Sequence, residues 1–250
     1  MLTKERQTII RDRLARDGKV VAIDLAAEFA VSEDTIRRDL RDLAKAGHCE
    51  RVYGGALAPA PDLGSFAQRE TVDADEKDRL GRAAAALVTA GQTVFIDAGT
   101  TNLAVARHLP RDIALTVVTN VPAVALALAA HDRVRIVLVG GNFDAAKGAC
   151  LGAEAMMSAQ HITPDVLFLG PCGINADAVS ALDPEEAALK RVLIANSRRI
   201  VVVATADKLG TTAPFRLAPV AALDAVVMDA DAAPQLADRL AGQGVSVVSA

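Results

Sequence analysis

Short amphipathic segments, each closed by turn residues, occupy the first part of the chain. Apolar residues recur at helical spacing over residues 3–16, namely Ile9, Ile10 and Leu14. Glycine tolerates the left-handed conformation that ends a helix, so Gly18 marks the expected end. A second short helix is expected over residues 22–29, with Leu25 and Phe29 buried. The pattern therefore predicts two consecutive helices.

A third helix is expected over residues 33–46, and its two faces differ in chemistry. Ser32 precedes it, at the position where a side-chain oxygen caps a helix. The apolar face carries Ile36, Leu40 and Leu43. The opposite face is polar and basic and carries Thr35, Arg37, Arg38 and Arg41. Residues 48–57 then alternate around Gly54 and Gly55, which predicts a β-hairpin.

The order of these segments is that of a winged helix-turn-helix unit. A short helix, a tight turn and a second helix with basic residues in its first two turns form the layout of a DNA reader. Arginine in such a helix pairs with guanine or binds phosphate, and the hairpin forms a wing along the DNA backbone or minor groove. The alternative is a plain helical hairpin with a solvated arginine face. The presence of the whole unit in order favours DNA reading.

Two strings in this part resemble the signature of the DeoR/GlpR family of bacterial transcriptional repressors. They are residues 31–40 (VSEDTIRRDL) and 51–56 (RVYGGA), and the family usually has His where Tyr53 stands. The resemblance implies operator contact at Ser32, Thr35, Arg37, Arg38, Arg51 and Tyr53. Asp39 also matches, and because a carboxylate repels phosphate we expect it to orient a neighbouring arginine. Contacts to the DNA backbone are also expected from two N-terminal residues, Lys4 and Arg6.

The rest of the chain is predicted to form a second domain, of the α/β class, over residues 75–250. Residues 58–74 begin with a stretch rich in Pro and Gly and are expected to be a linker, so the first domain covers residues 1–57. Apolar, β-branched runs predict strands over residues 93–97, 114–119, 134–139, 166–170, 200–204 and 225–228. Helices are expected over residues 75–89, 101–108, 121–130, 184–197 and 233–241. Strands that are apolar on both faces and separated by helices indicate a mostly parallel sheet with both faces covered.

Polar, glycine-rich turns follow most of these strands, and in a parallel sheet such turns share the carboxyl edge, where ligands bind. The turn over residues 97–102 offers hydroxyl and helix N–H groups to a phosphate. The candidate effector-binding residues are Asp97, Gly99, Thr100, Thr101, Thr119, Asn120, Gly140, Gly141, Gly170, Gly173, Lys190 and Lys208. Taken alone, each turn is more often only a tight turn. Together they predict a site for a small polyhydroxylated phosphate.

The same turns, in this order, resemble the sensor domain of the DeoR/GlpR family, which is similar in fold to ribose-5-phosphate isomerase and glucosamine-6-phosphate deaminase. Two turns depart from the family pattern. Residues 204–208 read ATADK where the family often has ADSSK, and residues 170–173 read GPCG in place of the usual GA(D/N)G. Both changes lie where the sugar portion of an effector would sit. The resemblance implies a phosphorylated sugar or related metabolite as effector, and it supports the phosphate more strongly than the sugar.

Composition narrows the class of protein without identifying it. Hydrophobic residues make up 52% and charged residues 23%, as in folded globular proteins. Net charge is +1 over residues 1–57 and −5 over the remainder, so the placement of the arginines matters more than the total. No apolar stretch approaches a membrane span and the N-terminus lacks a signal-peptide core, so a cytoplasmic location is expected. The cysteines are scattered, which argues against a disulfide framework or a zinc site.

The competing function is a sugar-phosphate isomerase or deaminase with an appended DNA-binding domain. Such chemistry needs a carboxylate base beside the substrate carbon and a second group that moves protons. The acids available are Asp97, Asp183, Glu185, Glu186 and Asp207. None lies in an acid-rich motif, and no histidine falls in the candidate turns. We therefore expect no catalytic residue, no metal and no cofactor besides the effector. The protein is further expected to be a homodimer or homotetramer that binds double-stranded operator DNA, and the effector is expected to release it from that DNA.

Overall fold

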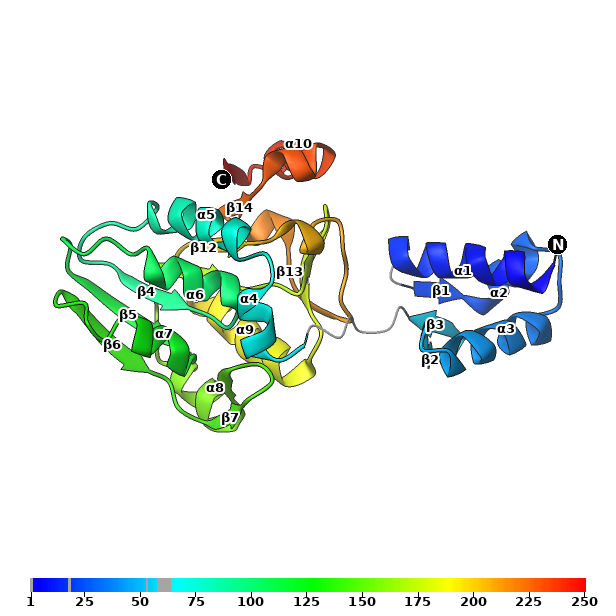
Figure 1. Ribbon diagram of the computed structural model, residues 1–250, viewed down its shortest axis with the longest axis horizontal. Helices are drawn as coiled ribbons and strands as arrows, with labels where there is room; N and C mark the ends of the chain where they lie inside the picture. The colour runs from blue at the N-terminus through cyan, green and yellow to red at the C-terminus, as the bar shows by residue number, and fades with distance from the viewer. Residues whose placement is uncertain (1, 18, 53, 58–63) are drawn as a thin grey trace. The chain divides into compact units, whose positions relative to one another are not determined.

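The computed structural model describes residues 2–17, 19–52, 54–57 and 64–250 (Figure 1). The chain divides into two compact units, Met1–Asp62 and Leu63–Ala250. The division falls inside the stretch expected to be a linker. Each unit has its own hydrophobic core, so each is described by itself.

The first unit packs three helices against a small antiparallel sheet. Its elements are α1 (Thr3–Asp17), β1 (Lys19–Val21), α2 (Ala22–Glu28), α3 (Glu33–Lys45), β2 (Glu50–Val52) and β3 (Gly55–Leu57). The strand order is β1-β3-β2, so the predicted hairpin gains a third strand from the segment before α2. The core is formed by the apolar faces of the helices and is centred on Leu25, Ile36 and Leu40. The winged helix-turn-helix architecture is confirmed.

The expectations for this unit differ from the structure at three points. Ile9 was included among the apolar positions of the first helix but is 38% exposed, because the buried face of α1 runs through Ile10 and Leu14 and turns the neighbouring position outward. Phe29 was expected to be buried but follows α2 as its C-cap and is only half-buried. Strand β1 was not expected, since three residues are too few to show an alternating pattern. Gly18 and Tyr53 lie outside the described residues.

The second unit is built on a seven-stranded parallel sheet in the order β15-β14-β12-β9-β4-β5-β6. Its strands are β4 (Thr93–Ile96), β5 (Leu115–Thr119), β6 (Val134–Leu138), β9 (Val166–Leu169), β12 (Ile200–Val203), β14 (Ala225–Met228) and β15 (Ser246–Ser249). Val94 of β4 lies opposite Val117 of β5 and Val166 of β9, which fixes the register at the centre of the sheet. The expected α/β class and parallel sheet are confirmed.

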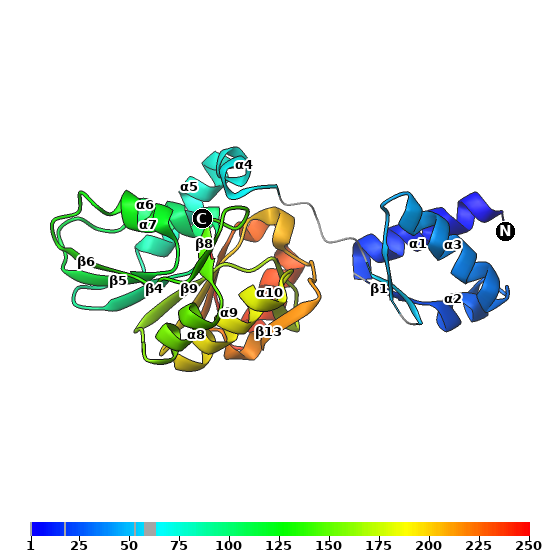
Figure 2. The same cartoon turned by 90° about the horizontal axis from the view of Figure 1, so that it is seen from below.

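Helices cover both faces of this sheet, as Figure 2 shows. The helices of the unit are α4 (Phe66–Thr71), α5 (Ala74–Ala85), α6 (Thr100–Arg107), α7 (Pro122–Ala127), α8 (Ala153–Gln160), α9 (Pro184–Asn196) and α10 (Pro234–Gly242). Val94 and Ile96 pack toward α5, α6 and α7, whereas Phe95 packs toward α8, α9 and α10. Alternate residues of one strand thus enter two separate cores, which explains why the strands are apolar throughout.

Smaller elements border the sheet. They are the hairpin β7–β8 (Asn142–Asp144 and Ala149–Leu151), the antiparallel set β10 (Gly173–Ile174), β11 (Ala178–Ala181) and β13 (Phe215–Pro219), and the short 3-10 helices η1 (Ala206–Lys208), η2 (Val220–Ala222) and η3 (Ala230–Ala232). None of these was predicted, nor were α4, α8 and β15. Two expected helices are shorter than predicted, since α5 ends at Ala85 and α7 at Ala127.

Candidate functional site

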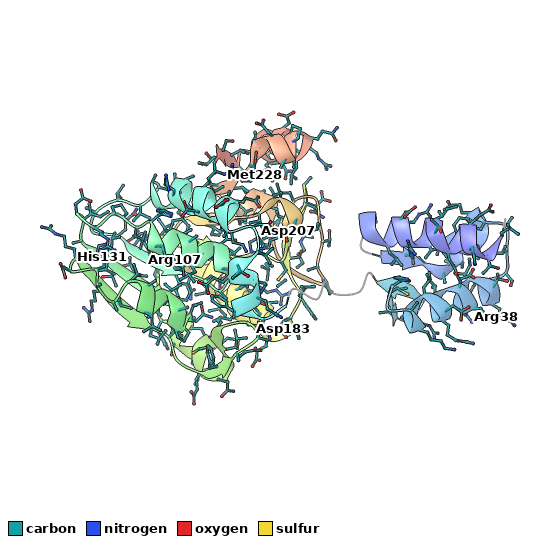
Figure 3. The ribbon with its side chains drawn as sticks, in the orientation of Figure 1. Arg38, Arg107, His131, Asp183, Asp207 and Met228 are labelled. Carbon is teal, nitrogen blue, oxygen red and sulfur yellow. The ribbon has the colours of Figure 1, made fainter. Side chains whose placement is uncertain are left out.

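Helix α3 presents a basic face because its apolar face is fixed in the core. The Ser32 hydroxyl caps the helix by accepting the Thr35 backbone N–H at 3.2 Å, and the two hydroxyls lie 2.9 Å apart. With Ile36 and Leu40 buried, the remaining positions of the helix turn outward. Figure 3 shows Arg38 at the outer surface of α3. The arginines predicted to read DNA are therefore on the exposed side.

Two of these arginines are paired with acids one turn earlier. The Arg37 guanidinium lies 2.9 Å from Glu33, and that of Arg38 lies 2.8 Å from Asp34. Side-chain exposure is 60% for Arg37 and 72% for Arg38, so both pairs are in contact with solvent. Exposed pairs at this spacing are weak, about 0.3–0.5 kcal/mol each. DNA phosphates and guanine edges compete easily with them.

Asp39 does orient an arginine, but one from another helix. Its carboxylate accepts a hydrogen bond from the Arg6 guanidinium of α1 and a longer one, of 3.4 Å, from Gln7. Both Arg6 and Asp39 are buried, so this ion pair ties α1 to α3. The expectation that Arg6 contacts the DNA backbone is therefore wrong, because its guanidinium is enclosed and already paired.

The remaining positions expected to contact DNA are either exposed or outside the described residues. Lys4 and Arg51 are exposed, at the start of α1 and on β2 respectively. Tyr53 lies outside the described residues. The structure thus presents Ser32, Thr35, Arg37, Arg38 and Arg51 on the surface of the first unit. These five side chains are available to a duplex.

In the second unit, a buried charge cluster joins three of the predicted effector residues. The ammonium of Lys190 contacts the Asp97 carboxylate, lies 3.1 Å from Glu186, and donates to the Gly170 carbonyl at 2.6 Å. The Gly170 N–H in turn donates to Asp97 at 3.1 Å. Burial by itself lowers the pKa of Lys190, but the carboxylates of Asp97 and Glu186 raise it above its ordinary value. The cluster joins the ends of β4 and β9 to α9.

Unpartnered polar atoms lie at the first turn of α6 and beside it. The Thr101 hydroxyl is buried and makes no hydrogen bond with any described residue. Asn102 donates to the carbonyls of Asp97 and Phe168 at 3.1 and 3.0 Å, but its own side-chain carbonyl has no donor. The side-chain carbonyl of Asn120 is also without a donor. Such atoms are costly when buried, and a bound polar ligand is one means of satisfying them.

Thr119 differs from its neighbours because its hydroxyl is already engaged. It donates to the Ile96 carbonyl at 2.7 Å and accepts the Val121 N–H at 3.1 Å. This side chain holds the end of β5 against β4. A structural role accounts for it without a ligand.

The predicted glycines fall into two groups. A Cβ at Gly170 would lie 2.1 Å from the Ala98 carbonyl oxygen, and Gly141 and Gly173 are also too close to neighbouring atoms to carry one. These three are required by packing. Gly99 (φ +138°) and Gly140 face open space. Gly99 and Gly140 therefore leave room beside the backbone for a ligand, and their role as effector-binding residues stays a prediction.

Lys208 follows β12 in η1 and is half-buried. Burial lowers its pKa, the adjacent carboxylate of Asp207 opposes that effect, and the charges of Arg69 and Lys190 reinforce it. Figure 3 shows Asp183 and Asp207 on the same side of this unit, with His131 at the opposite side. Glu186 and Asn102 also belong to this site, although neither was among the predicted effector residues.

The described part of the chain offers no evident metal site, membrane-spanning helix or reactive cysteine. No group of three or more His, Cys, Asp or Glu side chains there is placed to hold a metal ion. No described helix is long and apolar enough to cross a membrane. Burial raises the pKa of all three cysteine thiols, which argues against a reactive thiolate at these positions.

A winged helix-turn-helix unit followed by a parallel α/β unit is the organisation of a ligand-responsive transcriptional regulator. Residues 6–61 match the family described as DeoR-like helix-turn-helix domain, and residues 72–230 match the family described as DeoR C terminal sensor domain. The chain belongs to the DeoR family.

Full-length relatives agree with this assignment. The glycerol-3-phosphate regulon repressor of Escherichia coli K12 is 33% identical over 232 residues, which is 92% of each chain. The HTH-type transcriptional regulator GlpR of Haloferax volcanii is 31% identical over 253 residues, covering 99% of this chain and 98% of the relative. Among solved structures, ribose 5-phosphate isomerase A of Methanocaldococcus jannaschii aligns over 55% of each chain, with 13% identity and a TM-score of 0.40.

Proposed function

We propose that the protein is a sequence-specific transcriptional repressor of carbohydrate-metabolism genes, released from its operator by a phosphorylated sugar or related metabolite. The observation that carries the proposal is the exposed basic face of α3, displayed by a winged helix-turn-helix unit in a DeoR-family chain. The sugar-phosphate effector is supported by the name of the glycerol-3-phosphate regulon repressor and by the polar atoms at the sheet edge.

The protein acts in the cytoplasm as a homodimer or homotetramer, because a dimer places two recognition helices at the spacing of repeated half-sites. It requires no cofactor and catalyses no reaction. The effector binds at the carboxyl edge of the parallel sheet, near Gly99, Thr101 and the Asp97–Lys190 pair, and favours a protomer arrangement with lower operator affinity.

The test is a fluorescence-anisotropy titration of the full-length protein on its own upstream DNA and on random DNA. Arg38→Ala removes a charged contact at the recognition helix and is expected to weaken operator binding by about 1–3 kcal/mol, roughly 5-fold to 150-fold in Kd. Arg82→Ala, an exposed arginine of α5, is the matched control and should bind as the wild type does.

The same complexes are then titrated with a panel of sugar phosphates. One of these sugar phosphates is expected to release the protein from the operator. Equal affinity for operator and random DNA at moderate salt would contradict the repressor. Turnover of a sugar phosphate by the purified protein would favour the isomerase or deaminase alternative.

A further inference from the structure

Strand β6 is one lateral edge of the seven-stranded sheet, and its outer side is open (Figure 2). The Arg133 carbonyl accepts a hydrogen bond from β5 at 3.1 Å, and the Val139 N–H donates to β5 at 2.8 Å. Because main-chain groups alternate along a strand, those of Ile136 and Leu138 point away from β5. No described strand pairs with them there. The edge therefore offers free donors and acceptors to another strand.

Helix α7 packs on this edge of the sheet and is apolar on its outer side as well. Val124 is buried in the same core that Ile136 packs against. Residues 121–130 (VPAVALALAA) contain no polar or charged side chain, yet Leu126 is 76% exposed and Ala127 is also exposed. A helix that is apolar all round is normally enclosed. The outer side of α7 is therefore expected to be covered in the assembled protein.

Exposed apolar side chains gather on this side of the second unit. Among its described residues, the large apolar side chains that are exposed are Val72 and five between residues 126 and 157, namely Leu126, Val137, Leu138, Phe143 and Met157. The opposite edge strand, β15, instead exposes Ser246 and Ser249. Natural sheets protect open edges with polar or charged residues, which β15 has and β6 mostly lacks.

The sequence of β6 (VRIVL) is suited to pairing with a second copy of itself. In an antiparallel arrangement about a twofold axis at Ile136, Val134 lies opposite Leu138 of the partner subunit. On the other face of the strand, Arg135 lies opposite Val137 of the partner subunit. The one charged residue of the strand therefore meets an apolar side chain, which its stem can cover, and like charges do not face each other.

The amount of apolar surface is consistent with a contact between two proteins. The exposed parts of α7 and β6 offer on the order of 400 Å² per copy, as large as the functional patches of many globular proteins. A stable interface buries about 800 Å² per partner. These two elements thus supply roughly half of such an interface, and the paired main chain of β6 adds to it.

We propose that α7 and β6 form a surface by which two copies of this chain associate, with their β6 strands paired antiparallel about a twofold axis at Ile136. The inference rests on the homo-oligomer of the proposed function and assigns the surface that joins its subunits. The absence of charge over residues 121–130 disfavours nucleic acid or a charged peptide as the occupant. A twofold contact closes on itself, and it joins the two sheets into one continuous sheet.

The first test measures the mass of the full-length protein in solution by sedimentation velocity over a range of concentrations. Leu126→Lys combined with Leu138→Lys places two charges in the interface, and both positions are exposed in the single chain. Association is expected to weaken about a hundredfold or more, so that a dimer becomes a monomer or a tetramer becomes a dimer. Ser246→Lys, which adds the same charge to the opposite edge, is the control and should leave the mass unchanged.

A disulfide tests the pairing of the strands directly. Positions 135 and 137 of the two copies would form a pair without main-chain hydrogen bonds, with Cα atoms about 4.5 Å apart, which suits a disulfide. Arg135→Cys combined with Val137→Cys is therefore expected to give a covalent dimer on mild oxidation. Either variant alone places its two copies on the diagonal, about 7–8 Å apart, and should stay unlinked. The wild type, with its own cysteines at 49, 150 and 172, should also stay unlinked.

The proposal is overturned if the wild type is a monomer at the highest concentration measured, or if the double lysine variant keeps the wild-type mass. It is also overturned if Ser246→Lys lowers the mass equally, or if the double cysteine variant does not link. Failure of the repressor is distinguishable, because preference of the wild type for operator over random DNA is measured separately and does not depend on which surface joins the copies.

Discussion

At the scale of single residues, the recognition helix carries acids as well as bases. Glu33 and Asp34 occupy its first turn, where a duplex would meet them, and each is bound to an arginine one turn later. The N-terminus of a helix carries a partial positive charge that stabilises nearby carboxylates, which accounts for their placement there. They also set a negative charge close to where DNA phosphates would lie. Operator contact therefore requires Arg37 and Arg38 to exchange one anionic partner for another.

Removing these acids is expected to strengthen DNA binding. Glu33→Gln combined with Asp34→Asn frees both arginines and removes two repulsive charges, and we expect a several-fold gain on random DNA with a smaller gain on operator. Anisotropy at several salt concentrations measures both affinities. Asp12→Asn, which removes an exposed acid from α1, is the control. Weaker operator binding by the double variant would show instead that an acid contacts a base directly.

A second residue-scale prediction concerns the buried ion pair of the sensor domain. Lys190→Met leaves Asp97 and Glu186 without their counter-charge and is expected to cost about 3–5 kcal/mol of unfolding free energy in urea denaturation. The loss should shrink at low pH, because a buried carboxyl that has lost its cation has a raised pKa and is more stable protonated. Adding Asp97→Leu to Lys190→Met should recover part of the loss. A double variant less stable than the single one would contradict this account.

Some residues of the candidate effector site could be predicted from the sequence, and others could not. Asp97 was identified because it ends a strand, and Lys190 because it is a charge on the helix before the next strand. Their contact joins positions 93 residues apart and is not visible in any local pattern. Arg69 lies in α4, within the segment expected to be a linker, where no strand end marks it. Thr119 fits the pattern of a ligand-binding turn, yet its hydroxyl is engaged by Ile96 and Val121.

At the scale of elements, length and periodicity decided what was predictable. The long amphipathic helix α3 and the fully apolar strands β9 and β12 were expected nearly at their observed bounds. Strand β10 has only two residues, too few to show a pattern, and β13 contains Arg216 and ends at Pro219, so it lacks the continuous apolar run that marked β9 and β12. Helix α8 is rich in small residues and shows no clear apolar stripe. These elements are defined by tertiary pairing rather than by local sequence.

Pairing of β1 with β3 yields a prediction at this scale. A Cβ at Gly55 would lie 2.0 Å from the Val20 carbonyl oxygen, so Gly55→Ala is expected to separate the two strands and misplace the wing. Both the thermal stability of the first unit and operator affinity should fall. Gly54→Asn is the control, since Gly54 faces open space at φ +84° and asparagine tolerates that conformation. A normal melting curve for Gly55→Ala would refute the proposed constraint.

At the scale of the whole molecule, the two units have separate hydrophobic cores. Leu40 belongs to the core of the first unit and Leu193 to that of the second. Truncating either to alanine is expected to cost about 2–5 kcal/mol. Leu40→Ala should abolish operator binding and leave binding of the sugar phosphate by the second unit intact, whereas Leu193→Ala should abolish binding of the sugar phosphate and leave the first unit folded. Circular dichroism melting, anisotropy and titration with the sugar phosphate measure these outcomes, and loss of both activities in each variant would show that the units fold as one.

The acid–base pairs of α3 also affect how many copies of the repressor a cell requires. A chromosome offers on the order of a million or more sites of the wrong sequence, and each copy bound there is withdrawn from the operator. Glu33 and Asp34 place two negative charges beside these arginines, which lowers the attraction of the helix to phosphates of any sequence, and the net charge of −4 acts in the same direction. Fewer copies are then sequestered along the chromosome. For the repressor proposed above, a smaller pool of protein is then expected to keep the operator occupied.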